Sequence, residues 1–497
     1  MPASELLERI DELVTSLLPR VSDEVRSELE TLSRRLREPA RVAVVGRVKA
    51  GKSTLVNALL GQRVAPTDVS ECTRLVTWYR YGQPQRVELA LRDGTRRELM
   101  LTPEGMLPGE LGVPPEMVAS IDVFLANETL RNFTLIDTPG IGSVNREFSA
   151  ATEEFLNASA ESATATAAAD AVIFMLNTVV MQDELAILEQ LHGDAANRRS
   201  AVSTIGVLGR ADQLGDGSRD SWLIALELAD RFSATLRNDL ATVVPVIGLI
   251  AESSEAATLT EHHARSLRVL SEMDPNAFTK LTWSADRFVT GDAPLDEEVR
   301  QRLLSMLDLY GIVKAVNALR NGATGAVGLR RQLSGLSGIS EVKRTLVTYF
   351  RDQDHVLKAR SALELLRKLS FSSPGQSAPV LAELREAVEA LQLDPLMHPI
   401  IELETLHDLC TARVSLPSDL DEALRRLLVA GGPSARLGMG ASAEGAPVGD
   451  SAAVAQAAMA AMGRWRTFMV GEASPAQARV ARVALRSIQL IWEKAAT

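Results

Sequence analysis

The chain has 497 residues, of which 46% are hydrophobic and 24% charged, and its formal net charge is −11. Such a length exceeds what one hydrophobic core usually supports, so we expect more than one structural unit. The acidic balance argues against a protein whose main partner is nucleic acid, because phosphate binding normally needs a basic surface.

The two cysteines and the apolar runs bear on the compartment. Cys72 and Cys410 are far apart, and no Cys/His spacing typical of a metal site occurs, which is consistent with a reducing cytoplasm. The residues after Met1 lead into an acidic amphipathic stretch, so we predict no signal peptide. The longest apolar run, 172–181, is about half the length of a membrane span. Any membrane association is therefore expected to be peripheral.

Two amphipathic helices are predicted at the start, over 3–18 and 22–37, separated by Pro19 and ended by Pro39. In the second helix, apolar residues recur at spacings of three and four and so share one face. This face needs a partner from elsewhere in the chain. Its residues are Val25, Leu29, Leu32 and Leu36.

From 41 to about 290, short apolar runs alternate with helical stretches. This alternation predicts an α/β fold, with a mostly parallel sheet covered by helices on both faces. An antiparallel insertion is expected between the first two buried strands, with Asp93-Gly94 as its tight turn. Buried strands are expected at 41–46, 131–137, 171–176, 202–208 and 242–247, and inserted strands at 75–81, 87–91 and 96–101.

Helical periodicity dominates after about residue 295. The stretch Ala430–Asp450 is rich in Gly, Ala, Ser and Pro and is predicted to be a mobile loop. Across 339–369 the apolar residues Val342, Leu346, Phe350, Leu357, Leu363, Leu366 and Leu369 form an extended stripe, and further helices are expected at 295–320, 378–391, 397–411, 417–430 and 452–494.

The strongest motif is GRVKAGKS, which begins at Gly46 and lies between the strand 42–45 and the helical run 54–60. It fits the P-loop pattern, in which backbone N–H groups surround phosphates. Lys52 would reach the β and γ phosphates, and the Ser53 hydroxyl would bind Mg²⁺. The predicted phosphate-binding residues are Gly46, Arg47, Val48, Lys49, Ala50, Gly51, Lys52, Ser53 and Thr54.

A second motif, DTPG, begins at Asp137 directly after the apolar run 133–136. A DxxG pattern alone is most often a simple turn. After a buried strand, and downstream of a P-loop, it predicts a Mg²⁺ carboxylate that acts through water, and a Gly140 amide that senses the γ-phosphate.

A third motif, Gly209-Arg210-Ala211-Asp212, follows the predicted strand 202–208. An acidic side chain there can accept the N1–H and amino hydrogens of guanine, which adenine does not offer, so we predict GTP and GDP as ligands. Arg210 replaces the usual lysine that covers the base, and Gly209 has no side chain to brace the loop. The alternative is a surface loop. Residues 245–249 occupy the place of the backbone loop that closes over the base.

Thr73 is the candidate switch threonine for Mg²⁺ and the catalytic water, although spacing also allows Thr67 or Ser70. The predicted metal set is therefore Ser53, Thr73 and Asp137, the last through water. Lys52, Ser53 and Thr73 are predicted catalytic residues.

With these motifs in order and a helical second half, the chain resembles the bacterial dynamin-like proteins, closest to the actinobacterial isoniazid-inducible Ini dynamin-like group. The resemblance is carried by residues 44–59, 65–68 and 71–78, continues through 136–140, 210–212, 285–289 and 310–312, and extends more loosely to the end of the chain through 436–438.

This resemblance implies three regions: N-terminal neck helices at 1–38, a dynamin-type GTPase domain at 39–292, and a helical neck and trunk at 293–497 with a mobile loop at 430–450. It further implies that the helices of 1–38 share one bundle with those of 300–320 and 475–494. Proteins of this kind commonly pair their GTPase domains across the nucleotide and transmit hydrolysis to the neck.

One departure from the family concerns catalysis. Dynamins usually carry a polar residue that orients the attacking water where this chain has Val48, and an isopropyl group cannot hydrogen-bond water. We hypothesise that Lys49, with Arg47, supplies positive charge to the transferring phosphoryl group instead. The alternative is a pair of solvated basic side chains that only raise nucleotide affinity.

The predicted function is a GTP-hydrolysing dynamin-like protein that remodels or tethers membrane, working as a homodimer through its GTPase domains or with a second dynamin-like chain. It would be cytoplasmic and peripheral on the inner face of the cell membrane. One rival is a slow or non-hydrolysing nucleotide-dependent scaffold, and another is a P-loop kinase or ATPase. Two membrane-contacting segments are candidates: the turn at 370–375 with Phe371, which is otherwise a plain helix turn, and the loop at 430–450.

Overall fold

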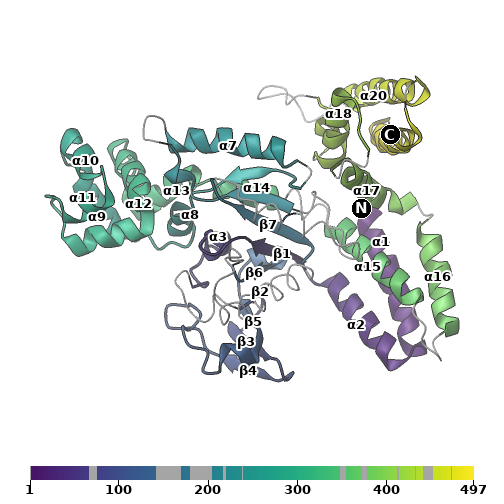
Figure 1. Cartoon of the computed structure of the whole chain (residues 1–497), viewed down its shortest axis with the longest axis horizontal. Helices are drawn as coiled ribbons and strands as arrows, with labels where there is room; N and C mark the ends of the chain where they lie inside the picture. The colour runs from purple at the N-terminus through teal and green to yellow at the C-terminus, as the bar shows by residue number, and fades with distance from the viewer. Residues whose placement is uncertain are drawn as a thin grey trace, which may run out of the picture.

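Nine strands form one sheet in the described part of the chain, near the middle of the molecule (Figure 1). The computed structural model describes residues 2–66, 75–140, 169–178, 188, 204–215, 220–237, 239–347, 354–371, 378–392, 395–410, 414–430, 432–439, 451–471 and 473–496. The strands are β1 (Ala40–Val45), β2 (Thr77–Tyr81), β3 (Arg86–Leu91), β4 (Arg96–Leu99), β5 (Val118–Leu125), β6 (Phe133–Asp137), β7 (Ala171–Leu176), β8 (Thr204–Leu208) and β9 (Val243–Pro245).

The strand order is β4-β3-β5-β2-β6-β1-β7-β8-β9, and the strands from β6 to β9 pair in parallel. The five buried strands expected from the apolar runs are confirmed as β1, β6, β7, β8 and β9. Because parallel strands end at one edge of a sheet, the segments after β1, β6, β7 and β8 meet there.

Both faces of the sheet are buried, as expected for parallel strands. Along β1, Val42 and Val44 belong to the core under α3 (Lys52–Leu60), whereas Ala43 and Val45 belong to the core under α7 (Ser221–Thr235). Alternate side chains of a strand point to opposite faces, so one short strand serves two cores.

The insertion at the sheet edge differs in part from the prediction. The β3–β4 hairpin is confirmed, and its turn carries Gly94 at φ +85° and a hydrogen bond of 2.9 Å from Thr95 N–H to the Asp93 carboxylate. However, β5 was not predicted, and β2 pairs with it in parallel while pairing antiparallel with β6. Asp122 interrupts the apolar pattern of β5 because its carboxylate pairs with Arg80 at 2.7 Å.

The first seven helices after β9 are α8 (Gly248–Glu255), α9 (Glu261–Ser271), α10 (Pro275–Leu281), α11 (Ala285–Thr290), α12 (Glu297–Arg320), α13 (Gly325–Leu336) and α14 (Ile339–Leu346). Helices α9 to α12 lie together at one end of the sheet (Figure 1). We call the sheet with α3, α4 (Thr129–Asn132) and α7 to α14 the head.

The apolar stripe expected over 339–369 is divided between two cores. Val342 and Leu346 of α14 lie in the core of the sheet. Leu363, Leu366 and Leu369 instead belong to α15 (Asp354–Ser370) and pack in a separate helical core. Periodicity alone did not show that the stripe crosses from one structural unit to another.

The N-terminal helices are confirmed as α1 (Pro2–Leu17) and α2 (Asp23–Arg37), but their predicted partners are wrong. Their apolar faces pack against α15 and α16 (Ala378–Gln392). The segment 300–320 lies in α12, which is buried against α9 and α11, and 475–494 lies in the last helix, which packs against its predecessor. A face of evenly spaced leucines fits many partners, so periodicity does not select one.

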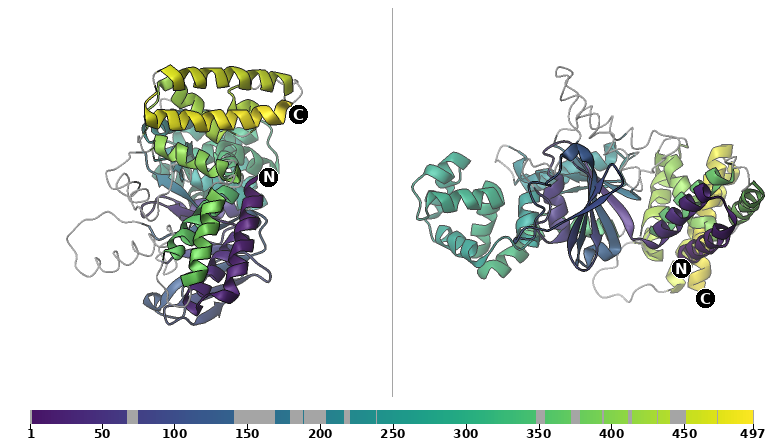
Figure 2. Two further views of the ribbon diagram at one scale, coloured as in Figure 1. Left: turned by 90° about the vertical axis from the view of Figure 1, so that its right-hand side faces the viewer. Right: turned by 90° about the horizontal axis from the view of Figure 1, so that it is seen from below.

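The C-terminal helices are α17 (His398–Cys410), α18 (Ser418–Val429), α19 (Pro433–Arg436), α20 (Ser451–Gly471) and α21 (Pro475–Ala496). The single helix expected over 452–494 is two long helices lying side by side (Figure 2). Pro475 starts the second helix, because proline lacks an N–H and fits a first turn. Residues 440–450 of the predicted mobile loop lie outside the described residues. Together with α1, α2, α15 and α16, these helices form what we call the helical unit.

Polar contacts join the helical unit to the head. The Asp170 carboxylate, at the start of β7, accepts a hydrogen bond of 3.0 Å from the Arg35 guanidinium of α2 and one of 2.9 Å from Arg41 N–H. Lys358 of α15 donates to the Glu38 carbonyl at 2.7 Å. The connection from α2 into β1 is thus held from both sides.

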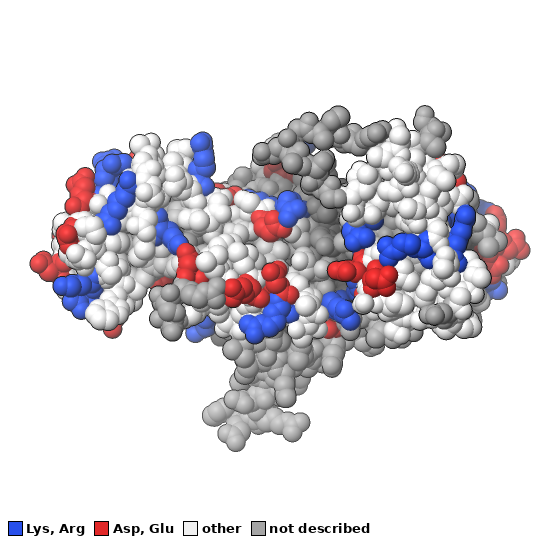
Figure 3. Space-filling model, turned by 90° about the horizontal axis from the view of Figure 1, so that it is seen from above, with Lys and Arg blue, Asp and Glu red and all other residues white. Residues whose placement is uncertain are grey.

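Charges of both signs are interspersed over the upper face of the molecule (Figure 3). Over the lobe formed by α18 to α21, the same view shows a large uncharged area crossed by basic side chains. Within the described ranges, no helix is both long enough and apolar enough to span a bilayer.

Candidate nucleotide-binding site

The P-loop connects β1 to α3 at the edge where the parallel strands end. Gly51, at φ +92°, is the residue directly before α3, so Lys52 and Ser53 form the first turn of that helix. A helix start carries partial positive charge and free N–H groups, which suit phosphate. At Gly46 a Cβ atom would lie 2.7 Å from the Met175 Cβ, so only glycine allows the loop to pass this close to β7.

The Lys52 ammonium is buried and held by the loop itself. Its Nζ donates to the Gly46 carbonyl at 3.2 Å and to the Arg47 carbonyl at 3.0 Å. Burial lowers the pKa of Lys52, and the nearby Asp137 charge opposes that change. A buried cation at the start of a helix is the arrangement needed to attract the β and γ phosphates.

Asp137, at the end of β6, meets Ser53 across the site. The Ser53 hydroxyl donates to Asp137 Oδ2 at 2.8 Å. Among the described residues, the buried Asp137 Oδ1 has no hydrogen-bond partner. Burial raises the pKa of this carboxyl, while Lys52 and the Ser53 hydrogen bond oppose the rise.

The oxygen atoms of this pair fit a Mg²⁺ site. An unpartnered buried carboxylate oxygen is costly unless a cation or water satisfies it, and Mg²⁺ prefers oxygen ligands. No group of three or more His, Cys, Asp or Glu side chains suited to a metal occurs in the described part of the chain. Ser53 and Asp137 are therefore the described side chains that would hold the ion beside the phosphates.

Gly140 and Val48 show how closely the DTPG turn approaches the P-loop. A Cβ atom on Gly140 would lie 2.7 Å from Val48 Cα and 2.8 Å from Val48 Cγ2. The Val48 side chain is 56% exposed. The isopropyl group therefore faces solvent next to the position predicted for the γ-phosphate, and it offers no group that could orient water.

Arg210 ties the predicted base-reading loop to the P-loop. Its Nη2 donates to the Lys49 carbonyl at 2.7 Å. Both residues adopt positive φ, +53° for Arg210 and +62° for Lys49, a conformation that is strained for residues with a side chain. A Cβ on Gly209 would lie 3.2 Å from the Ala50 carbonyl oxygen. The bracing that Gly209 lacks is thus provided by the Arg210 guanidinium.

Asp212 follows in a short 3-10 turn at Ala211–Gln213. Burial raises the pKa of its carboxyl, the negative charge of Asp308 adds to the rise, and Arg210 opposes it. Asp308 lies at a kink in α12, where its backbone has φ +54° and ψ 174°. No sequence motif marks Asp308 as a second acidic residue acting on the predicted base reader.

The part of α12 after the kink holds the segment that follows the base-reading loop. The Tyr310 hydroxyl donates to Asp220 Oδ1 at 2.7 Å, and Lys314 Nζ donates to Asp220 Oδ2 at 2.5 Å. Asp220 in turn caps α7 by accepting from Trp222 N–H at 3.1 Å. The helices beyond the sheet thus reach the edge of the predicted base site.

Thr73 and Met175 differ from the other residues of the site, because the first lies outside the described residues and the second was not predicted. Thr73, with its alternatives Thr67 and Ser70, lies outside the described residues. Met175 was missed by sequence reasoning, although its position near the end of a buried parallel strand could have signalled it. Its side chain lies under Gly46 and Gly209 and forms the floor on which the two loops meet.

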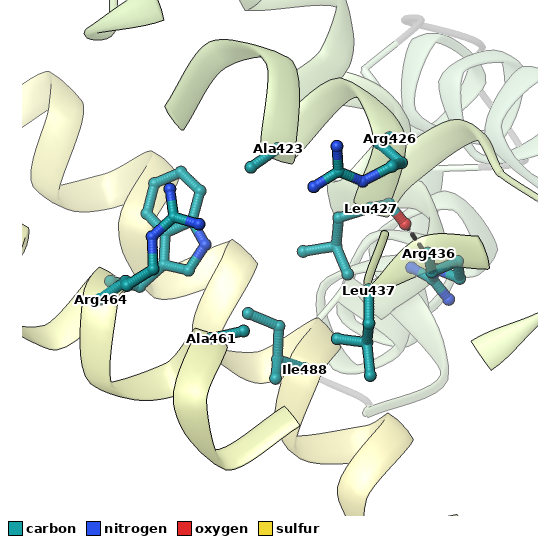
Figure 4. A pocket seen from close by; sticks show the side chains of 9 residues that line it. Ala423, Arg426, Leu427, Arg436, Leu437, Ala461, Arg464 and Ile488 are labelled. Carbon is teal, nitrogen blue, oxygen red and sulfur yellow. Dashed lines mark hydrogen bonds between the residues drawn. The ribbon is translucent and has the colours of Figure 1, made fainter. Parts of the chain in front are cut away.

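A separate cavity of about 40 Å³ lies in the helical unit, between α18 and α21 (Figure 4). Its apolar lining consists of Ala423, Leu427, Leu437, Ala461, Trp465 and Ile488. The Arg436 guanidinium, at its edge, donates to the Leu427 carbonyl at 2.5 Å and pairs with Glu402 at 2.6 Å. This arginine therefore joins helices of the unit and is not available to a ligand.

Comparisons with known proteins cover both the site and the whole chain. Residues 42–211 match the dynamin family model, which spans the P-loop, the DTPG turn and Arg210. The isoniazid-induced protein IniC of Mycobacterium tuberculosis is 34% identical over 484 residues, covering 95% of this chain and 93% of that protein. Dynamin-like protein 2 of Campylobacter jejuni is 26% identical over 152 residues, or 30% of this chain and 25% of that protein. A solved structure of an oligomerised bacterial dynamin pair, described as sensing and tethering membranes, covers 98% of this chain and 90% of that chain at 14% identity and a TM-score of 0.32.

Proposed function

This chain belongs to the bacterial dynamin-like GTPases, in the group of the isoniazid-induced protein IniC, and from that membership we propose that it hydrolyses Mg²⁺-bound GTP at residues 46–54, 137–140 and 209–212. The observation that carries the proposal is the 2.8 Å contact between Ser53 and Asp137 beside the buried Lys52. It joins two motifs that are far apart in sequence into one phosphate and cation site.

Each described residue of the site has a role in this proposal. Lys52 and the start of α3 neutralise the phosphates, and Ser53 and Asp137 hold Mg²⁺, Asp137 through water. When bound, Mg²⁺ neutralises charge on the β and γ phosphates. Asp212 accepts the guanine N–H groups, while Arg210 keeps its loop against the P-loop. Thr73 remains the proposed switch residue.

Binding and turnover test this proposal directly. Replacing Lys52 by Ala is expected to weaken GTP binding by roughly a hundredfold, since a buried charge-assisted contact to phosphate is lost. Calorimetry with GTP, GDP and ATP measures the loss and the base preference, and phosphate release measures hydrolysis. Equal affinity of the wild type and Lys52→Ala for GTP would contradict the assignment.

Lys49 is proposed to stabilise the transferring phosphoryl group. Its side chain is exposed, and its carbonyl is fixed by Arg210, so the ammonium is free to reach a phosphate of its own site or that of a paired head. Lys49→Ala is expected to slow single-turnover hydrolysis without a matching loss of GTP affinity. A normal chemical step with weaker binding would reduce Lys49 to an affinity residue.

A second candidate function, a slow or non-hydrolysing scaffold, is favoured by Val48. The exposed isopropyl group stands where dynamins usually orient water. Steady-state turnover of the wild type, alone and with lipid or a second dynamin-like chain, separates the two functions. If turnover in all of these conditions is no faster than spontaneous GTP hydrolysis, the scaffold function is favoured.

We further propose that the head moves relative to the helical unit during the GTPase cycle. The contacts around α13 and α14 support placing the boundary after α14 instead of at 292/293, because Ile339 and Leu346 pack in the sheet core. Residues 1–38 would then join the helices from α15 onward as the neck and trunk. Head pairing, homotypic or with a second dynamin-like chain, is tested by light scattering with a non-hydrolysable GTP analogue.

Peripheral membrane contact on the inner face of the cell membrane is proposed for the α18–α21 lobe. From Ser451 to Gly463, α20 has no charged residue, and Met459 on this stretch is 60% exposed. Arg464 and Arg466 follow on exposed positions. An uncharged face bordered by arginines suits an anionic lipid surface.

The rival contact, Phe371, is 63% exposed but lies against the Arg385 guanidinium, whose carbon is 4.3 Å from the ring centroid. Liposome flotation with Met459→Asp and Phe371→Asp distinguishes the two sites, and a deletion of 440–448, which keeps Arg436 and its contacts, tests the loop. Loss of flotation with Phe371→Asp alone would move the contact to the α15–α16 end.

A further inference from the structure

The side chain of Asn57 is fully buried in α3 and uses its entire hydrogen-bonding capacity. Its Nδ2 donates to the Ala65 carbonyl at 2.9 Å and to Glu252 Oε1 at 2.7 Å. Its Oδ1 accepts from Val64 N–H at 3.0 Å and from Ala65 N–H at 2.8 Å. An amide has two donor hydrogens and two acceptor lone pairs, so no position is left open and the orientation of the group is fixed.

Glu252 reaches Asn57 from α8, nearly two hundred residues later in the chain, and it is also buried. Arg63 lies 3.6 Å from the same carboxylate oxygen. Burial raises the pKa of Glu252, and the Asn57 hydrogen bond and the Arg63 charge oppose that rise. A buried carboxylate is costly, and here its cost is offset by a specific amide donor and a nearby guanidinium.

These contacts connect three parts of the nucleotide site. Asn57 lies on the same helix as Lys52 and Ser53, one turn further on. Val64 and Ala65 lead into the segment that carries Thr73. Helix α8 starts at Gly248, inside the stretch 245–249 that was predicted to cover the base, and a Cβ there would lie 3.4 Å from Thr54 Cγ2.

We propose that Asn57, held in place by Glu252, is a positioning residue for GTP hydrolysis. It fixes the chain at Val64 and Ala65 relative to the phosphate-binding turn of α3, and it ties both to the helix behind the base. The inference rests on the proposed hydrolysis and adds to it a pair of residues that do not touch the nucleotide.

Asn57→Asp tests this arrangement with almost no change in shape. The substitution turns the donating Nδ2 into an acceptor oxygen that faces Glu252 Oε1 and the Ala65 carbonyl, while Val64 and Ala65 N–H keep their acceptor. We expect single-turnover GTP hydrolysis to fall by roughly tenfold or more, because two buried contacts become repulsive. Affinity for GDP is expected to change by less than about threefold, since the P-loop is untouched.

The double variant Asn57→Asp/Glu252→Gln supplies the rescue. The amide that this change introduces at position 252 can donate to the new carboxylate, which restores one of the two lost contacts and removes one negative charge. We expect it to recover part of the hydrolysis rate lost in Asn57→Asp. A direct steric or folding defect at position 57 would not be relieved by a change at position 252.

Glu255→Gln is the matched control, because Glu255 lies on the same short helix but contacts α13 and α14 instead of Asn57. Its carboxylate accepts from Ser334 Oγ and Lys343 Nζ, each at 2.5 Å, on α13 and α14. Losing this ion pair is expected to lower the melting temperature while leaving single-turnover hydrolysis unchanged. Glu252→Leu provides a second test if Asn57→Asp does not fold. It removes one of the two acceptors of Asn57 Nδ2, together with the carboxylate beside Arg63, and is expected to slow hydrolysis.

Three results would overturn the inference. The first is a hydrolysis rate equal to that of the wild type in Asn57→Asp, or in Glu252→Leu if Asn57→Asp does not fold. The others are a loss of GDP affinity as large as the loss of hydrolysis rate, and a double variant that hydrolyses GTP no faster than Asn57→Asp. Each leaves the proposed function standing as long as the wild type hydrolyses GTP. Absence of hydrolysis by the wild type would instead overturn the proposed function, and this inference with it.

Discussion

The head and the helical unit both have apolar cores, but in the head a cluster of buried polar groups is added at the candidate nucleotide site. In the head, buried polar groups such as Lys52, Asn57 and Asp137 meet specific partners at the ends of strands and helices. The core between α1, α2, α15 and α16 is instead mostly leucine and valine. Hydrogen bonds fix direction as well as distance, whereas apolar contacts are non-directional. The buried polar groups of the head therefore fix one geometry, whereas the apolar core of the helical unit constrains direction much less.

The largest effect is expected when apolar packing is removed from the helical unit. Leu29 of α2 is fully buried, so Leu29→Ala is expected to lower the free energy of unfolding by about 2–5 kcal/mol. GTP affinity should stay close to that of the wild type, because the nucleotide site lies in the other unit. Denaturant unfolding and calorimetry check the two halves of this prediction. A parallel loss of GTP affinity would show that the two regions are not energetically separate.

The next largest effect is expected when a charge is removed from the head. Asp137→Asn is expected to weaken Mg²⁺-dependent GTP binding by about 1.5–3 kcal/mol, because the neutral amide cannot replace the carboxylate beside the ion. Titration of GTP with and without excess EDTA measures this. Asp122→Asn, on β5 and outside the nucleotide site, is the control. Undiminished Mg²⁺ dependence in Asp137→Asn would remove this residue from the metal site.

A smaller effect is expected at the junction between the two regions. Arg35→Ala leaves the Asp170 carboxylate with the Arg41 N–H donor and is expected to cost about 1 kcal/mol of stability, because Arg35 is partly exposed. Its control is Arg37→Ala, whose ion pair with Asp11 lies within the helical unit and is more exposed. If the junction transmits the GTPase cycle, Arg35→Ala will also change stimulation of hydrolysis by lipid. Unchanged stimulation would limit the contact to a structural role.

The smallest expected effect concerns pH. If Asp212 reads guanine as proposed, it does so in its ionised form, whereas burial and Asp308 raise the pKa of this carboxyl in the free protein. GTP affinity is therefore complete above that raised pKa and decreases as pH falls through it, because binding must then expel a proton. Asp308→Asn should lower the pKa of Asp212 and shift the loss of affinity to lower pH. Affinity profiles of the wild type and Asp308→Asn with the same nucleotide measure the shift, and identical profiles would contradict it.

Much of the head could be predicted from sequence because its signals are local. The five parallel strands were short apolar runs, and the three motifs follow β1, β6 and β8 within a few residues. The P-loop binds phosphate largely through its own backbone and the helix that follows it, so a contiguous stretch defines both its shape and its chemistry. Strand β5 was not predicted, because Asp122 interrupts its apolar pattern and the partner of this carboxylate, Arg80, lies on another strand.

What the sequence determined by itself was therefore the class of fold, the phosphate chemistry and the existence of most helices. Only the tertiary structure decided that α1 and α2 pack against α15 and α16, that α12 carries Asp308 to the base reader, and that Glu252 holds Asn57. Each of these depends on residues distant in the chain. A helix face of leucines can pack against many partners, and an isolated polar residue gives no sign in the sequence of which residue it will contact. Only the folded chain therefore selects which of them meet.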